Sequence, residues 1–396
     1  MMGLTELCTA IDSRASSEPP VACSQGDLVP TRLVKIALAA VLLAPGAAAD
    51  EILQRGAQRP FKGSVLSEDV GKVKYKLENV PQPQELDAAL VADIQYDDAP
   101  EPYVKGRELL RKGEAENAAN SFRLALKAKT KNNWIAVYGN YYLGVSLQML
   151  GSKDANKLKD AAATFAQLLK DSPDCRFLPD ALQRQADALA ASGDATGAAA
   201  VYDRLATVAR EKKLGILWEA QAQVKKADAF ASNGMTKEAT AAYSQAGSFA
   251  ESNAAQQKDE NVKQSLLAIV GRAQLSQGAT LLRDKKYLEA KQFFERVAQG
   301  SNATAEVVAS ALNGIGEVLL EEGKSHDALD QFARVRVRYY LVHEQAARAT
   351  YFLGRSVLAL KDAEPNGRKK ASDYFAEVIE RYGDTPWADR ARAEIK

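Results

Sequence analysis

Apolar and polar positions recur along this chain with one fixed internal spacing from Gly106 towards the C-terminus. A small residue is followed three positions later by a large apolar residue, and further on by an alanine with an aromatic four positions after it. The first copy consists of Gly106, Leu109, Ala118, Phe122 and Ala125. Apolar residues spaced by three and four positions share one face of a helix, so each copy predicts two amphipathic helices joined by a turn.

Seven copies follow this spacing, and two of them carry a five-residue insertion in the turn. We predict that the aromatic of each copy fills the core between neighbouring helices. These aromatics are Phe122, Phe165, Tyr202, Tyr243, Phe294, Phe332 and Phe375. Glycines stand where the first helix of a copy must end, at Gly113, Gly151, Gly193, Gly234 and Gly323. Such short helices are marginal alone, so we expect the copies to stabilise one another by stacking.

The pattern resembles the tetratricopeptide repeat (TPR) family, whose signature has a small residue, an alanine and an aromatic at these relative positions. The resemblance covers residues 99–383 as seven repeats, and residues 384–396 look like a capping helix. It implies a mainly α fold, a right-handed superhelical solenoid of helix-turn-helix repeats. Residues 171–174 and 382–388 are similar to an inter-repeat element of TPR proteins of the bacterial cell envelope.

In TPR proteins the first helix of each repeat lines a concave groove that binds a partner. Carried over by the repeat register, the partner-binding positions are Tyr138, Tyr141, Gln148, Gln183, Asp187, Arg272, Asn313, Glu317, Arg348, Tyr351 and Arg355. The C-terminal part of this set mixes arginines with a tyrosine, which suits an extended or acidic peptide. Plain solvent-exposed surface is the alternative interpretation. A carboxylate-clamp subtype is not supported, because Tyr103 and Arg107 stand where it needs lysine and asparagine.

Residues 50–98 have a different pattern, with near period-two alternation that is typical of β-strands. The alternating runs cover residues 61–66, 72–78 and 85–96. We predict a small β-rich module, a curled sheet or partial barrel, similar to short β-modules that precede TPR arrays in some exported proteins. A module this small barely buries a core, so it should dock on the first repeat or self-associate.

Residues 29–49 have the layout of a secretory signal peptide: basic residues, an apolar stretch and an A-x-A site that ends at Ala49. A transmembrane anchor needs about 20 apolar residues, and Pro45 interrupts this stretch. We therefore expect cleavage after Ala49 and export to the periplasm or cell envelope. Residues 1–28 are predicted to be a disordered extension that results from a start site placed too early.

Composition narrows the classes of partner and of chemistry. Lys plus Arg number 52 and Asp plus Glu 51, so no strong field attracts nucleic acid. With two histidines, and Cys175 as the single cysteine after residue 49, we expect no metal site, disulfide or nucleophilic triad. Gly323-Lys324-Ser325 lacks the preceding glycine of a phosphate-binding loop, so no nucleotide or other cofactor is expected.

The sequence therefore predicts an exported, non-enzymatic scaffold or adaptor that binds a protein or peptide and has no transmembrane span in its mature form. Two alternatives stay open. The protein could be a structural component of the envelope that self-assembles as a homo-oligomer, or an accessory subunit of an envelope enzyme.

Overall fold

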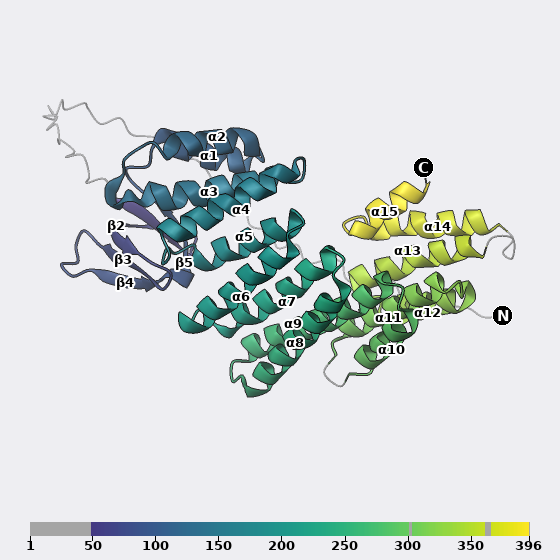
Figure 1. Ribbon diagram of the computed structural model, residues 1–396. Coiled ribbons are helices and arrows are strands. Elements are labelled where there is room, and N and C mark those ends of the chain that lie inside the picture. Colours follow the sequence, from purple (N-terminus) through teal and green to yellow (C-terminus); the bar gives the residue numbers. More distant parts are fainter. Residues whose placement is uncertain (1–48, 301–302, 361–365, 396) are drawn as a thin grey trace, which may run out of the picture. The chain divides into compact units, whose positions relative to one another are not determined.

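The computed structural model describes residues 49–300, 303–360 and 366–395 of the 396-residue chain (Figure 1). In this part a small antiparallel sheet precedes fifteen α-helices that pack in sequence order. The expectations for the N-terminal extension and the signal peptide concern residues 1–49, of which all but Ala49 lie outside the described residues.

The N-terminal sheet has five antiparallel strands in the order β4-β3-β2-β1-β5. The strands are β1 Asp50–Gln54, β2 Phe61–Glu68, β3 Lys72–Lys76, β4 Gln84–Asp87 and β5 Val91–Gln95. Their buried face contributes Ile52, Val73, Val91 and Ile94 to the core. The predicted β-rich module is thus present as a small antiparallel sheet.

Two features of the sheet differ from the sequence prediction. Strand β1 was not predicted, and the run at 85–96 forms two strands instead of one. The short 3₁₀-helix Ala88–Leu90 separates them, and Asp87 Oδ1 caps it by accepting a hydrogen bond from the Ala89 N–H at 2.8 Å. Because β4 and β5 lie at opposite edges and only three residues separate them, the sheet must curl so that its two edges come close at this turn.

The helices form seven successive pairs and one final helix, as the repeat pattern predicted. The first helices of the pairs are α1 Glu101–Arg111, α3 Trp134–Leu150, α5 Leu178–Ala191, α7 Ile216–Ser232, α9 Glu260–Arg283, α11 Ala305–Glu321 and α13 His343–Ala359, and α15 Pro386–Ile395 follows them. The second helices are α2 Ala115–Ala125, α4 Ala155–Asp171, α6 Ala195–Glu211, α8 Thr236–Gln256, α10 Tyr287–Ala298, α12 Ser325–Arg338 and α14 Gly367–Arg381.

In the five pairs whose small residue is glycine, the aromatic of the second helix packs against that glycine of the first helix. A Cβ atom on Gly316 would lie 2.6 Å from the Phe332 ring, which is fully buried. Phe294 has such a neighbour on each side, because a Cβ would lie 2.5 Å from it at Gly278 and 2.7 Å from it at Gly314. The small residue is needed because the ring occupies the space of a side chain.

The turn between the two helices of a pair uses left-handed backbone conformations where the sequence placed glycine. Gly193 has a φ of 95°, and in the fifth pair Lys285 takes the same role with a φ of 59°. Gly151 also follows its helix directly, but it has a right-handed φ of −59°. The turn of the second pair, which carries the insertion, therefore does not use a left-handed residue at this glycine.

The sheet packs on the helical array through an aromatic and polar interface. Tyr96 stacks on Trp134 with ring centroids 4.2 Å apart, and Arg107 of α1 pairs with Asp93 of β5 at 2.9 Å. The Val70 N–H donates a hydrogen bond to the Asp174 carbonyl at 2.8 Å. The sheet therefore docks on the first two repeats and on the segment that leads into α5.

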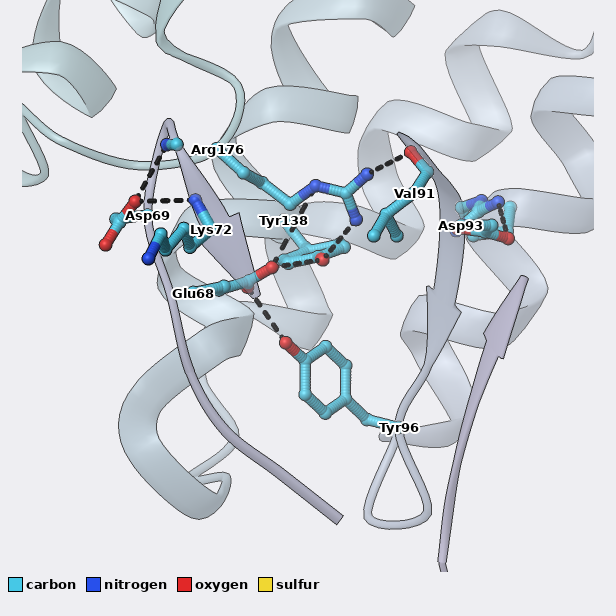
Figure 2. A network of polar contacts seen from close by, with 10 residues as sticks. Glu68, Asp69, Lys72, Val91, Asp93, Tyr96, Tyr138 and Arg176 are labelled. Carbon is cyan, nitrogen blue, oxygen red and sulfur yellow. Dashed lines mark hydrogen bonds and ion pairs between the residues drawn. The ribbon is translucent and has the colours of Figure 1, made fainter. Parts of the chain in front are cut away.

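A buried polar network, shown in Figure 2, lies at the centre of this interface. The hydroxyls of Tyr96 and Tyr138 each donate a hydrogen bond to the Glu68 carboxylate at 2.8 Å. Arg176 donates to the Tyr138 hydroxyl at 3.1 Å and to the Val91 carbonyl at 2.9 Å. Burial raises the pKa of Glu68, while the charge of Arg176 and the two tyrosine hydrogen bonds lower it.

Candidate functional site

Side chains of consecutive first helices are joined by polar contacts, which we call the first-helix ladder. Its contacts, in chain order, are Arg107 over the Tyr142 ring (4.4 Å), Tyr141 to Asp180, Arg184 to Gln148 (3.2 Å), Lys225 to Asp187 (2.9 Å), Arg272 to Asp228 (2.5 Å), Arg348 to Glu317 (2.7 Å) and Arg355 to Glu394 (3.1 Å). Each contact reaches from one repeat to the next. The ladder therefore orients neighbouring repeats and neutralises charges along this surface.

In the third and fourth repeats the ladder is bonded to the core. The aromatic of the second helix, which we call the wedge aromatic, is a tyrosine in these two repeats. Its hydroxyl donates a hydrogen bond to the aspartate that follows the small residue of the first helix. Tyr202 reaches Asp187 at 2.5 Å, and Tyr243 reaches Asp228 at 2.6 Å. Burial, followed by the charge of the aspartate, raises the pKa of Tyr202, so its hydroxyl stays protonated and donates.

The ladder is interrupted between α9 and α11. Among the residues that the structure describes, no hydrogen bond, ion pair or ring contact joins these two helices, whereas every other consecutive pair of first helices is joined. In the junction before it, Asp228 pairs with Arg272, and in the junction after it, Glu317 pairs with Arg348. In both junctions the carboxylate comes one position after the small residue of its first helix, and the arginine comes six positions before the small residue of the next first helix. Ala279 and Ser310 occupy these positions in the α9–α11 junction, so both partners of the ion pair are missing.

A pocket of about 940 Å³ lies at this junction, and we call it the α9–α11 pocket. Residues of α9, α10, α11 and the loop between α10 and α11 line it, together with Glu251 of α8 and Gln345 of α13. The two first helices touch at one of its walls, where a Cβ on Gly271 would lie only 2.6 Å from Val307 Cγ2. Its volume is at the upper end of the range of about 300–1,000 Å³ that is usual for ligand pockets.

Charge in the α9–α11 pocket is confined to its rim. The charged residues that line it are Glu251, Arg272, Arg296 and Glu306, and all four are exposed. Every buried or half-buried lining residue is apolar or carries an uncharged amide or hydroxyl. The interior of the pocket is therefore uncharged.

Two amide side chains form a buried pair beside the pocket. Asn313 is fully buried, and its Nδ2 donates to the Gln345 backbone carbonyl at 3.0 Å and to Gln345 Oε1 at 3.2 Å. A carbonyl only accepts hydrogen bonds, so the position of the Gln345 carbonyl fixes which end of the Asn313 amide faces it. Gln345 Oε1 must then face Asn313. Gln345 as a residue is 8% exposed, and its Nε2 is accessible to solvent and makes no hydrogen bond to any residue that the structure describes. The buried atom of this pair without a partner in the described part of the chain is Asn313 Oδ1.

The structure places the predicted partner-binding residues in three different settings. Eight of them belong to the ladder or to its immediate partners: Tyr141, Gln148, Asp187, Arg272, Glu317, Arg348, Tyr351 and Arg355. Gln183 is half-buried on α5. Tyr138 and Asn313 are fully buried.

Burial corrects the expectation for Tyr138 and Asn313. The sheet covers Tyr138, whose hydroxyl bonds to Glu68 and Arg176, so it has no surface for a partner. Asn313 bonds to Gln345 within the array. The arginines expected to attract an acidic peptide are each paired with a carboxylate, as Arg348 is with Glu317 at 2.7 Å. Their charge is therefore already balanced.

Sequence reasoning missed the residues that complete the ladder and the pocket. The missed ladder partners are Asp180, Arg184, Lys225, Asp228 and Glu394. Comparing the positions next to the small residue in successive repeats would have found most of them, since opposite charges recur there. Gln345 had no such signal, because its position in α13 looks like any polar helix position.

Within residues 49–300, 303–360 and 366–395, no three His, Cys, Asp or Glu side chains are grouped so that they could hold a metal ion. No helix in these ranges combines the length and the apolar character that a membrane span requires.

Comparison with known proteins bears on the repeats themselves. A family model described as tetratricopeptide repeat matches residues 153–213 and 313–364. A comparison with curated proteins finds no match.

Among solved structures, apo RapI is similar at 12% identity and a TM-score of 0.45, over 74% of this chain and 79% of that one. A tetratricopeptide repeat protein from Parabacteroides merdae ATCC 43184 is similar at 15% identity and a TM-score of 0.42, over 74% and 96%. The matched segments belong to the register that runs from α1 to α15. Residues 153–213 and 313–364 of the helical array therefore match the tetratricopeptide repeat, and the other helix pairs follow the same register.

Proposed function

We propose that this protein is a non-catalytic scaffold that binds a segment of another protein at the α9–α11 pocket and on the first helices beside it. The interruption of the first-helix ladder carries this proposal. At every other junction, side chains of neighbouring first helices bond to one another. At the α9–α11 junction the chain leaves a pocket with uncharged walls instead. Concave sites of this volume with a few polar groups are the usual places for a ligand.

We propose in addition that the protein is exported to the periplasm or cell envelope. The basic, apolar and A-x-A segments of residues 29–49 support export, and the first strand begins at Asp50, the residue after the expected cleavage site. Mass spectrometry of the protein purified from cell fractions tests this. Export requires a mature N-terminus at Asp50 in the exported fraction, and an intact chain confined to the cytoplasm would contradict it.

Binding at the pocket is tested by filling it. Ala268 is an exposed residue of α9 that lines the pocket, and Ala376 is an exposed residue of α14 that does not. We expect Ala268→Trp to abolish capture of a partner from cell extract, because the indole occupies the pocket. Ala376→Trp should capture the partner as the native chain does. Equal capture by both variants, or capture of only further copies of this chain, would contradict the proposal.

A further inference from the structure

We propose that the α9–α11 pocket takes an uncharged, extended peptide segment, and that Gln345 Nε2 donates a hydrogen bond to a backbone carbonyl of that segment. This inference rests on the proposed function, because it names the chemical class of the partner at the same pocket. The uncharged interior and the amide pair of Asn313 and Gln345 carry it.

The distribution of charge decides against an acidic or basic anchor. The two arginines and two glutamates of the rim balance one another, and the lining residues below them are uncharged. Arg272 is already paired with Asp228, and the Arg296 guanidinium lies 5.3 Å from the centre of the Phe293 ring. A charged side chain that entered the pocket would lose its hydration without gaining an ionic partner. An uncharged segment does not lose such hydration.

Among the polar residues that line the pocket, Gln345 alone is buried, and its Nε2 is unused. Its side-chain oxygen accepts from Asn313, which directs Nε2 away from that bond, and Nε2 has no hydrogen-bond partner in the described part of the chain. Nε2 is accessible to solvent, so water satisfies it in the free chain and an acceptor of a ligand can replace that water. The matching group in an uncharged peptide is the backbone carbonyl. Asn313 is thus a positioning residue, and Gln345 is the residue that binds.

The remaining walls of the pocket fit the side chains of such a segment. Leu267, Leu275, Phe293 and Val307 line it and are each half-buried, so each has apolar surface left to cover. Covering that surface with an aliphatic or aromatic side chain of the segment gains hydrophobic stabilisation. The backbone hydrogen bond would set the register of the segment, and the apolar wall would select its side chain.

The experiment pans a library of random seven-residue peptides against the purified chain, and then measures the affinity of the selected peptides. We expect the selected peptides to share an uncharged apolar core. We expect Gln345→Met to weaken their binding between about 5-fold and 100-fold, because the buried peptide carbonyl loses its donor. Gln223→Met, on a half-buried glutamine of α7 that does not line the pocket, is the matched control and should bind like the native chain.

Replacing single amides of a selected peptide by esters adds a test that does not depend on how the Gln345→Met variant folds. An ester carbonyl is a weaker acceptor, so one ester position should weaken binding to the native chain and have little effect on binding to Gln345→Met. Selected peptides with acidic cores, or equal affinity for native and Gln345→Met chains, would overturn the inference while leaving the scaffold function intact. Failure of the native chain to select any peptide would also overturn it. The Ala268→Trp capture experiment tests the scaffold function separately.

Discussion

Single tyrosine hydroxyls connect distant parts of this chain. The Tyr138 hydroxyl donates to Glu68 of the sheet and accepts from Arg176, which precedes α5. The repeat register alone places Tyr138 on the ligand side of its helix. It does not show that the sheet covers that position, because the contact is made across 70 residues of sequence. The wedge aromatics were predicted correctly because their partners belong to the same or the next repeat.

Removing the Tyr138 hydroxyl should therefore destabilise the fold and leave partner binding unchanged. We expect Tyr138→Phe to lower the free energy of unfolding by about 1.5–3 kcal/mol, the usual contribution of a hydrogen bond to a charged group. Tyr142→Phe, on the same helix, removes a hydroxyl that makes no hydrogen bond to the residues that the structure describes, and it serves as the control. Urea unfolding measures both effects. Loss of partner capture without loss of stability would restore Tyr138 to the binding surface.

Glu68 should give the native chain a distinct pH dependence. Burial raises its pKa in the folded state above the ordinary value of 4.5, so the folded state holds this proton more tightly than the unfolded state. The stability that Glu68 contributes is fully present below pH 4.5 and is lost as the pH rises towards its folded pKa. Glu68→Gln cannot titrate and should lack this loss. Urea midpoints measured from about pH 4 to about pH 7 test it, and parallel curves for the two chains would contradict it.

At the scale of the element, each helix pair depends on a ring that fits between backbones. The spacing in the sequence predicted these pairs because it encodes a contact within one repeat, as between Gly316 and Phe332. The strands were predicted less well. Strand β1 holds one fully buried apolar residue, Ile52, so its period-two signal is weak. The break between β4 and β5 depends on a cap at Asp87 that alternation does not reveal.

Phe294 is the most direct test of this packing. We expect Phe294→Ala to cost about 3–5 kcal/mol of stability, because the ring fills the space between Gly278 and Gly314 and leaves a cavity when it is removed. Phe293→Ala removes the adjacent, half-buried ring and should cost clearly less. Thermal unfolding of the two variants provides the comparison. Equal melting temperatures for Phe294→Ala and the native chain would contradict the claim that this ring stabilises the packing between the helices.

At the scale of the whole molecule, seven repeats and a capping helix are joined by a ladder that has one gap in the part of the chain that the structure describes. The sequence predicted the number and order of the repeats, because each carries its own pattern. The gap was not predicted from the sequence. Ala279 and Ser310 stand where the neighbouring junctions have an ion pair, and only the ion pairs seen in the structure show that these two positions matter. The proposed partner binding therefore depends on the one junction that differs from the others, and not on a feature that all repeats share.

Completing the ladder should close the site. In the double variant Ala279→Glu with Ser310→Arg, the α9–α11 junction acquires the ion pair of its neighbours. We expect a gain in stability of about 0.2–1 kcal/mol, as for a partly exposed pair, together with loss of partner capture. Ala279→Glu alone does not place a side chain in the pocket and should capture the partner normally. Full capture by the double variant would show that the gap has no part in binding.

Photo-crosslinking tests the central claim, binding at the α9–α11 pocket, most directly. A benzophenone amino acid is placed at Ala268, which lines the pocket, and in a second chain at Ala376 of α14, and the adducts formed in cells are identified by mass spectrometry. The proposed function requires one distinct protein to be linked from position 268 and not from position 376. The same adducts from both positions, or adducts with this chain alone, would contradict it.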